Sequence, residues 1–285
     1  GRELKALNSF SVADAIRYFS GVQLKDYGGI GGLKTINIRS MGSHHVGIFY
    51  DGIQLGNAQN GQIDLGKYSL DNIDEISIYN GQKSDIFQPA KDFSTSGSVY
   101  IRSRTPRFDY DKSHNLRATV KTGSFDLVNP SVLYEYKISD DLSTSFNSEY
   151  IKSSGKYKYR YKRVQPGSDE VMYDTTAVRE NGDIESLRLE AGLYGLLNQG
   201  HWKLKTYYYD SERGIPGAIV NNRWMNPQRQ WDRSFFVQGS MQKGITNDYQ
   251  ILVNAKYAND YMRYMNPDTT LMLIDNSFRQ QESYL

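Results

Sequence analysis

The sequence predicts a small mixed α/β domain followed by the antiparallel strands of a transmembrane β-barrel. From Arg104 onward, apolar and polar residues alternate in runs of about ten residues, the span of a tilted membrane strand. Short and long connections between these runs alternate along the chain, as they do in outer-membrane barrels. Gly (25) and Tyr (23) are abundant and Pro (7) is scarce, which suits many strands joined by glycine turns better than a helical bundle.

The composition excludes several classes of protein. A formal net charge of +2 over 285 residues is too small to indicate nucleic-acid binding. The chain has no Cys, which excludes disulfides, a thiol nucleophile and thiolate metal sites. No apolar run approaches the roughly 18 residues of a membrane helix. The chain begins at Gly1 without Met or a signal peptide, so we expect a processed or excised piece of a longer protein.

The first hundred residues carry the signals of the mixed domain. A helix is predicted where apolar residues recur at helical spacing between a serine cap and Gly21: Val12, Ala13, Ile16 and Phe19, with Ser9 or Ser11 as the cap. Short apolar runs bounded by Gly, Asn and Asp predict a small mixed sheet within residues 35–105. The loop 56–62 holds four carboxamides, which favour either a solvated loop or a hydrogen-bonding surface for a polar ligand.

Seven alternating runs predict the barrel strands, and an eighth is expected near Arg279. The runs span residues 116–121, 132–138, 142–150, 187–193, 202–208, 235–238 and 249–257. Residues 154–183, 211–230 and 260–280 are expected to be long outer loops, whereas Gly123 to Asn129 is a short loop on the same side. Aromatic residues near the strand ends fit interfacial girdles: Tyr150, Trp202, Tyr207, Tyr208, Tyr209 and Trp231.

The first long loop contains a strip in which tyrosines and cations interleave. Tyr157, Tyr159 and Tyr161 alternate with lysines and an arginine, and we interpret this strip as an outer hairpin. A soluble β-sandwich is the alternative to the barrel, because its strands also alternate. The outward side chains of the run Leu187–Leu193 distinguish the two folds, since they face lipid in a barrel and a second sheet in a sandwich.

At this point the residues resemble a known family, the TonB-dependent outer-membrane receptors. The resemblance is carried by the order and spacing of five short motifs: Ser11-Val12-Ala13-Asp14-Ala15-Ile16, Ile36-Asn37-Ile38-Arg39, Asp51-Gly52-Ile53, Ile73-Asp74-Glu75-Ile76 and Ser98-Val99-Tyr100-Ile101-Arg102-Ser103. It implies that residues 1–105 are a plug domain and that residues 106–285 are the first seven to eight strands of an outer-membrane β-barrel. Within the family, two segments are most similar to the cobalamin receptor type: the glycine-rich segment Gly28 to Gly32, and the segment that leads from His44-His45 to Asp51.

The resemblance and barrel geometry together predict a fragment. A barrel of about eight strands is filled by its own side chains and cannot enclose a plug of about 100 residues. We therefore expect part of a plugged barrel of the 22-stranded type. The sequence departs from the family at Asn80, at Phe87-Gln88 and near Thr95-Ser96. Because Asn80 replaces a plug arginine that normally pairs with barrel glutamates, Arg39 is left as the candidate for plug–barrel contact.

The function that the resemblance implies is TonB-dependent active import of a scarce ligand across the outer membrane of a Gram-negative bacterium. Cobalamin or another corrinoid is the expected ligand, with ferric siderophore or haem as alternatives. The predicted ligand-binding residues are the loop carboxamides Asn57, Gln59, Asn60 and Gln62. The TonB energy-coupling complex is the expected partner, and a surface lipoprotein is a further candidate. The hypothesis from a different class is a soluble β-sandwich surface adhesin.

Other polar clusters in the sequence are candidates for metal binding or catalysis. Asp169, Glu170 and Asp174 lie in the longest predicted loop, where clustered carboxylates suit calcium, and the resembled cobalamin receptors order outer loops with calcium. A solvated acidic loop is the alternative. His44 and His45 are adjacent on a strand and point to opposite faces, which argues against a metal site. No nucleophile elbow or Ser-His-Asp spacing is present, so we expect no enzyme and no required cofactor.

Overall fold

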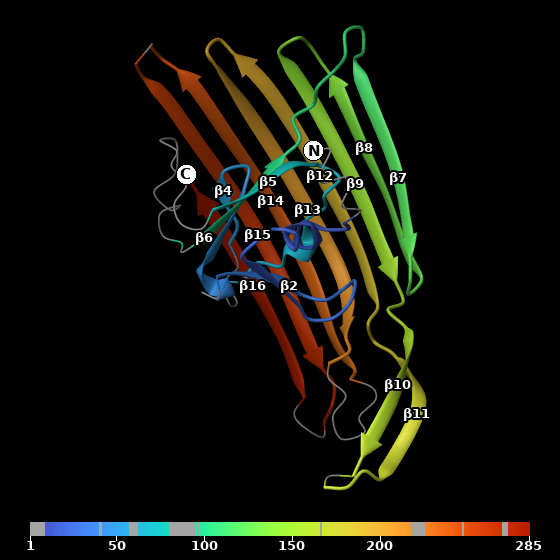
Figure 1. The fold of residues 1–285 in the computed structure, drawn as a ribbon. Helices are drawn as coiled ribbons and strands as arrows, with labels where there is room; N and C mark the ends of the chain where they lie inside the picture. The colour runs from blue at the N-terminus through green and yellow to red at the C-terminus, as the bar shows by residue number, and fades with distance from the viewer. Residues whose placement is uncertain are drawn as a thin grey trace.

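The chain folds into a small N-terminal domain that lies against one face of a large antiparallel sheet (Figure 1). The computed structural model describes residues 9–39, 42–56, 62–79, 95, 97–165, 167–217, 226–246, 248–269 and 273–285. The small domain ends with β6 (Gly97–Ser103), and the large sheet begins with β7 (His114–Gly123). The predicted boundary after residue 105 falls in the connection between these two strands.

The N-terminal domain is a mixed sheet with one short helix. Its sheet has the strand order β4-β3-β6-β5, in which β3 and β6 are parallel and the other pairs are antiparallel. The elements in chain order are α2 (Val12–Ile16), β1 (Val22–Asp26), β2 (Lys34–Ile38), η1 (Ser43–His45), β3 (Val46–Tyr50), β4 (Ile53–Gln54), η2 (Leu65–Lys67), β5 (Ile73–Tyr79) and β6. The prediction of one sheet through residues 35–105 is wrong for β2, which pairs with β1 in a separate two-stranded sheet.

The helix begins where the sequence predicts it. Ser11 is the N-cap and forms a capping box with Asp14, in which the Ser11 hydroxyl accepts from the Asp14 N–H and the Asp14 carboxylate accepts from the Ser11 N–H at 3.2 Å. The helix buries Val12 and Ile16 completely. It is shorter than predicted, since the chain turns after Ile16. No helix in the described residues is long and apolar enough to cross a membrane.

The large sheet has eight antiparallel strands in the order β16-β15-β14-β13-β12-β9-β8-β7 (Figure 1). Its strands after β7 are β8 (Leu127–Lys137), β9 (Leu142–Ser153), β12 (Ile184–Leu197), β13 (Gly200–Ile215), β14 (Gln228–Gly244), β15 (Gln250–Asn266) and β16 (Ile274–Tyr284). Within the described residues the sheet is open, because its edge strands β7 and β16 do not pair with each other. Pairing between all sequential neighbours confirms the predicted antiparallel strands.

The strands are longer, and the loops shorter, than the sequence predicts. β13 continues to Ile215 and β15 to Asn266, so parts of the predicted loops 211–230 and 260–280 are strand. Residues 154–183 contain the hairpin of β10 (Tyr157–Val164) and β11 (Val171–Arg179), which confirms the predicted outer hairpin. The alternation does not extend to these strand ends because polar residues such as Asp210, Glu212 and Arg263 occupy outward positions there.

The two ends of the sheet have different connections. At one end, residues 138–141 and 198–199 form tight turns, and a short connection joins β14 to β15. At the other end lie the β10–β11 hairpin and the connections 216–227 and 267–273, together with the short β7–β8 turn. Phe125 and Asp126 in that turn adopt positive φ angles of 66° and 56°, which a three-residue connection requires. This asymmetry is the one predicted, including the short exception on the long-loop side.

The two faces of the large sheet expose apolar side chains and bury polar ones, the reverse of the distribution in a soluble protein. Leu187 and Leu193 on the outward face are 37% and 36% exposed, whereas Arg188 and Glu190 on the inward face are only 2% and 3% exposed. A sandwich would bury the apolar face against a second sheet, and no described element covers it. An apolar face turned outward and a polar face turned inward are typical of a membrane barrel.

Aromatic rings join the small domain to the large sheet. Tyr207 of β13 stacks on Phe236 of β14 with ring centroids 4.8 Å apart, and Tyr68 stacks on Tyr207 at 5.4 Å. Tyr50 of β3 meets Phe236 edge-on at 6.1 Å. These rings belong to the same buried core as the helix and the mixed sheet. The small domain therefore packs its own core directly onto the inward face of the sheet.

Candidate functional site

The segment Asp64–Lys67, which includes η2, fixes the small domain to the large sheet. Asp64 caps η2, since its Oδ1 accepts from the backbone N–H of Gly66 at 3.0 Å and of Lys34 at 3.1 Å. The other carboxylate oxygen of Asp64 contacts Arg213 of β13 at 3.1 Å. One buried side chain thus orders its own turn and binds the sheet.

A buried network of two carboxylates and two cations extends from Asp64. Arg213 contacts Asp232 of β14 at 3.2 Å as well as Asp64, and Lys67 contacts Asp232 at 3.0 Å. Burial disfavours the charged form of Lys67, but Asp232 and Asp64 outweigh this effect and raise the pKa of Lys67 above its usual value. Each charge has an opposite partner, which is the condition for burying charges at acceptable cost.

Backbone carbonyls of the same segment accept bonds from the sheet. Arg188 of β12 donates from Nε to the Lys67 carbonyl at 2.6 Å, and the Tyr207 hydroxyl donates to the same oxygen at 2.7 Å. Arg188 also forms a buried ion pair with Glu149 of β9. The Gly66 and Lys67 carbonyls of η2 are therefore satisfied by side chains of the large sheet.

A second polar contact lies around Glu190 of β12. Lys205 contacts Glu190 at 2.8 Å, and the carboxylate also accepts from Asn72 at 2.9 Å and from the Tyr50 hydroxyl at 3.2 Å. Both partners from the small domain lie within its core. The buried glutamate is thus paired with a cation of its own sheet, and two neutral donors join it to the small domain.

Asp51 makes a third contact with the large sheet. Its carboxylate accepts from the backbone N–H and hydroxyl of Ser103 at 2.9 and 2.7 Å, and it contacts Lys203 of β13 at 2.9 Å. Burial favours the neutral acid, but Lys203, Lys205 and the Ser103 hydroxyl together hold the pKa of Asp51 below its usual value. Asp51, a turn residue of the small domain, is therefore ionised and joins this domain to β13 through an ion pair.

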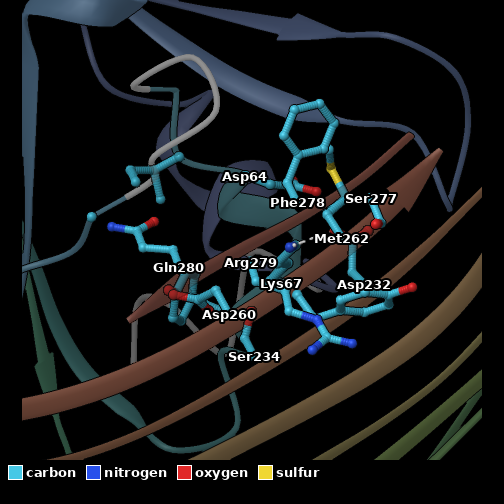
Figure 2. A pocket seen from close by; sticks show the side chains of 14 residues that line it. Asp64, Lys67, Asp232, Ser234, Asp260, Met262, Ser277, Phe278, Arg279 and Gln280 are labelled. Carbon is cyan, nitrogen blue, oxygen red and sulfur yellow. Dashed lines mark hydrogen bonds and ion pairs between the residues drawn. The ribbon is translucent and has the colours of Figure 1, made fainter. Parts of the chain in front are cut away.

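A cavity of about 460 Å³ lies between the small domain and strands β14–β16 (Figure 2). Side chains from both parts of the chain converge on it, including Asp64 and Lys67 from the small domain. Its lining combines carboxylates, hydroxyls, aromatic rings and aliphatic groups: Gly56, Ile63, Asp64, Lys67, Tyr68, Asp232, Ser234, Asp260, Tyr261, Met262, Ser277, Phe278, Arg279 and Gln280. A mixed lining of this volume suits a small organic ligand.

The cavity lies toward the end of the sheet that carries the longer connections. Asp232 follows the connection 216–227 by a few residues, and Ser277 follows the connection 267–273. Gly56, which lines the cavity, directly precedes the carboxamide loop. The cavity is therefore lined by residues that lie close in the sequence to the predicted ligand-binding carboxamides.

Most of the predicted ligand-binding residues lie outside the part of the chain that the structure describes. Asn57, Gln59 and Asn60 lie outside the described residues. Gln62 is described, and its amide nitrogen lies 3.0 Å from Nε2 of His44. It does not line the cavity, although its neighbour Ile63 does. The ligand-binding role of the four carboxamides stays a prediction.

The plug–barrel contacts come from residues other than the predicted one. Arg39 is exposed, with a backbone φ of 49°, and its N–H donates to the Gly21 carbonyl at 3.1 Å. Its proposed contact stays a prediction, while Asp51, Asp64 and Lys67 make the ion pairs described above. The sequence signals for these three are weak, because Asp51 and Lys67 each lie beside a glycine and Asp64 lies two residues before one, so all three look like ordinary turn residues.

The predicted calcium ligands are not brought together. Both carboxylate oxygens of Asp174 are engaged by Arg160, at 2.9 and 2.6 Å across the β10–β11 hairpin. Asp169 and Glu170 are exposed at its tip. Within the part of the chain that the structure describes, no group of three or more His, Asp or Glu residues is arranged to hold a metal ion.

Comparisons with known proteins agree with this architecture. The family described as TonB-dependent Receptor Plug Domain matches residues 1–91. Among curated proteins, the Vitamin B12 transporter BtuB of Vibrio vulnificus (strain YJ016) is 25% identical over 173 residues, which are 61% of this chain and 27% of that protein. The chain thus spans about a quarter of the length of this relative.

Solved structures share the fold at low sequence identity. The copper transporter OprC superposes with a TM-score of 0.70 at 13% identity, covering 96% of this chain and 39% of that one. The ferric yersiniabactin uptake receptor FyuA from Yersinia pestis gives 0.64 at 12% identity, covering 99% and 43%. The ferric citrate transporter FecA gives 0.61 at 17% identity, covering 92% and 38%. These likenesses concern the fold alone.

Proposed function

We propose that this chain belongs to the TonB-dependent outer-membrane receptors. In such a receptor it forms the plug and the adjoining barrel wall of an importer for a scarce ligand. The observation that carries the proposal is the cavity between plug and barrel. Its lining includes Gly56 and Ile63 of the plug together with residues of β14, β15 and β16. The TonB complex is the partner that supplies the energy.

The ligand that we propose is cobalamin or another corrinoid. Support comes from the similarity to a vitamin B12 transporter and from the cavity lining, in which carboxylates and hydroxyls accompany Tyr68 and Phe278. Aromatic and aliphatic groups suit contact with part of the flat macrocycle, and polar groups suit its amide side chains, so we propose that the cavity holds one portion of this large ligand. Ferric siderophore and haem remain the alternatives within the same class of importer, because solved receptors with this fold include siderophore receptors.

Ligand binding to the detergent-purified complete receptor tests the proposal. Isothermal titration calorimetry compares cyanocobalamin with haem and a ferric siderophore. We expect tight binding of cyanocobalamin alone, and loss of that binding in a variant with Asn57, Gln59, Asn60 and Gln62 replaced by Ala.

The matched control is Q242A/Q250A, which removes an exposed pair of carboxamides 3.1 Å apart at the tight-turn end of the sheet. It should bind as the unchanged receptor does. Binding of an iron complex without binding of cyanocobalamin would retain the importer and eliminate the corrinoid.

A further inference from the structure

One carboxylate of the cavity differs from its neighbours in having no ion pair. Asp64 and Asp232 share Arg213, and Asp232 also contacts Lys67. Asp260 of β15 lines the same cavity, and among the described residues its side-chain partner is the hydroxyl of Ser234. Asp260 therefore presents a negative charge that a neutral donor satisfies only in part.

The nearest cations are already occupied. Lys67 and Lys256 lie within electrostatic range of Asp260. Lys67 contacts Asp232 at 3.0 Å, while Lys256 contacts Glu282 at 3.1 Å and donates to the Gln54 carbonyl at 3.1 Å. Each ammonium group is therefore already engaged by another carboxylate, and neither forms an ion pair with Asp260.

The remaining cation at the rim lies on the other face of the sheet. Asp260 is directly opposite Ser234 and Gln280 in the strand register, whereas Tyr261 is opposite Arg279. Successive side chains on a strand point to opposite faces, and the Arg279 guanidinium lies over the Tyr261 ring, 5.6 Å from its centroid. Arg279 is thus held away from Asp260, and Figure 2 shows Asp260 beside Ser234 and Gln280.

We infer that Asp260 determines which ligands the cavity accepts, favouring those that carry N–H donors or a positive charge and disfavouring anionic complexes. This inference rests on the proposed function, because it takes the cavity as the ligand site. A carboxylate with free acceptor capacity binds an amide or ammonium donor through a charge-assisted hydrogen bond. An anionic ligand brings a like charge into a partly desolvated space, where repulsion is strong.

The candidate ligands differ in their N–H donors and in their net charge. A corrinoid carries peripheral amides whose N–H groups can donate to Asp260. A cationic ferric hydroxamate such as ferrioxamine B also carries N–H groups, whereas ferric dicitrate is anionic and has none. Asp260 should therefore favour the first two ligands over the third, whichever of the two the receptor imports.

The test compares D260N with D275N in the complete, detergent-purified receptor, by calorimetry with cyanocobalamin, ferrioxamine B and ferric dicitrate. Both variants lose one negative charge, but Asp275 pairs with Arg263 on the outward face and does not line the cavity. We expect D260N to weaken the donor-bearing ligand about tenfold and to improve any ferric dicitrate binding, with no change in D275N. D260E, which keeps the carboxylate, should remain close to the unchanged receptor and controls for folding.

The outcomes distinguish this inference from the proposed function. Cyanocobalamin binding that is equal in D260N and the unchanged receptor overturns the role of Asp260 and leaves the corrinoid proposal intact. Ferrioxamine binding without cyanocobalamin binding, weakened by D260N, overturns the corrinoid proposal and supports the role of Asp260. A preference of the unchanged receptor for ferric dicitrate overturns both.

Discussion

The inward and outward faces of the large sheet differ in polarity, because they face different surroundings. On the outward face, Ala191 and Leu193 are exposed and carry no polar group. On the inward face of the same strand, Arg188 and Glu190 are buried, and each has an oppositely charged partner. A single strand therefore meets hydrocarbon on one side and a polar protein surface on the other.

This difference shows what the plug does for the sheet. Inward polar groups of an open channel are solvated by water, whereas here the carbonyls of Gly66 and Lys67 and the side chains of Asp51, Asp64 and Asn72 take the place of water. Specificity of plug docking thus resides in polar contacts, and the outward face needs only to be apolar. Changes on the two faces should differ in kind and in size.

The largest effect is expected from breaking a buried ion pair on the inward face. Arg188→Met leaves the Glu149 carboxylate buried without its cation, and we expect it to lower the free energy of unfolding by about 3–5 kcal/mol. Urea titration of the complete receptor in lipid vesicles, followed by Trp fluorescence, measures this. The double variant E149Q/R188M should recover much of the loss, because no isolated charge remains.

The matched control for this change is Arg263→Met on the outward face. Arg263 pairs with Asp275 at 2.7 Å, but both side chains are more than two-fifths exposed. We expect no measurable change in stability, since exposed pairs contribute little. Equal losses for R188M and R263M would contradict the distinction between the two faces.

A charge placed on the outward face should have the next largest effect. Ala191 lies midway along β12 and is exposed, so Ala191→Arg creates no steric conflict with the plug. In lipid vesicles we expect a loss of about 2–4 kcal/mol in the free energy of unfolding, the cost of an arginine near the bilayer midplane. Ala191→Leu is the control and should be close to neutral. A neutral Ala191→Arg would show that this face meets water, as in a soluble sandwich.

The sequence predicts the strands better than it predicts the site, for a physical reason. Alternation with period two is a local signal, so runs such as 187–193 could be assigned to strands and to faces directly. The helix cap at Ser11 is also local and was found. The strand ends at Ile215 and Asn266 lie beyond the predicted runs, because polar residues such as Asp210, Glu212 and Arg263 occupy outward positions there and interrupt the alternation.

The plug–barrel contacts depend on pairs that are far apart in the sequence. Asp64 and Arg213 are separated by 149 residues, and neither has an unusual neighbour that marks it. The prediction that Arg39 contacts the barrel rests on the family resemblance alone. The cavity could not be predicted either, since it needs the registers of β14, β15 and β16 against a loop of the plug. Local signals reach only as far as the carboxamide segment 56–62, whose first residue, Gly56, lines the cavity.

A smaller effect is expected from the pH dependence of plug docking. Because the pKa of Asp51 is lowered in the folded protein, its ionised form contributes stability above the unfolded pKa of about 3.9. That contribution is lost as the pH falls below this value and through the folded pKa. Asp51→Asn should cost about 1–3 kcal/mol at neutral pH, since Ser103 and Lys203 lose a charged acceptor.

Unfolding free energies measured between pH 3 and pH 6 check this prediction. The unchanged receptor should lose stability toward pH 3, and Asp51→Asn should show a flatter profile. Asp109→Asn is the control, because Asp109 is exposed in the connection between the two domains. Profiles of equal slope for all three proteins would show that Asp51 does not govern docking.

The smallest effect is expected in the outer hairpin, which contacts water on both sides. Arg160 and Asp174 form an exposed pair, so Asp174→Asn should leave the unfolding midpoint of the receptor unchanged. The same variant tests the calcium hypothesis, because a metal at Asp169, Glu170 and Asp174 would have to displace Arg160. We expect added calcium to leave proteolysis of the β10–β11 hairpin unaltered in the unchanged receptor and in Asp174→Asn. Protection by calcium that disappears in Asp174→Asn would instead show that Asp174 exchanges its arginine for a metal, and that the outer hairpin, unlike the plug interface, is ordered by an ion.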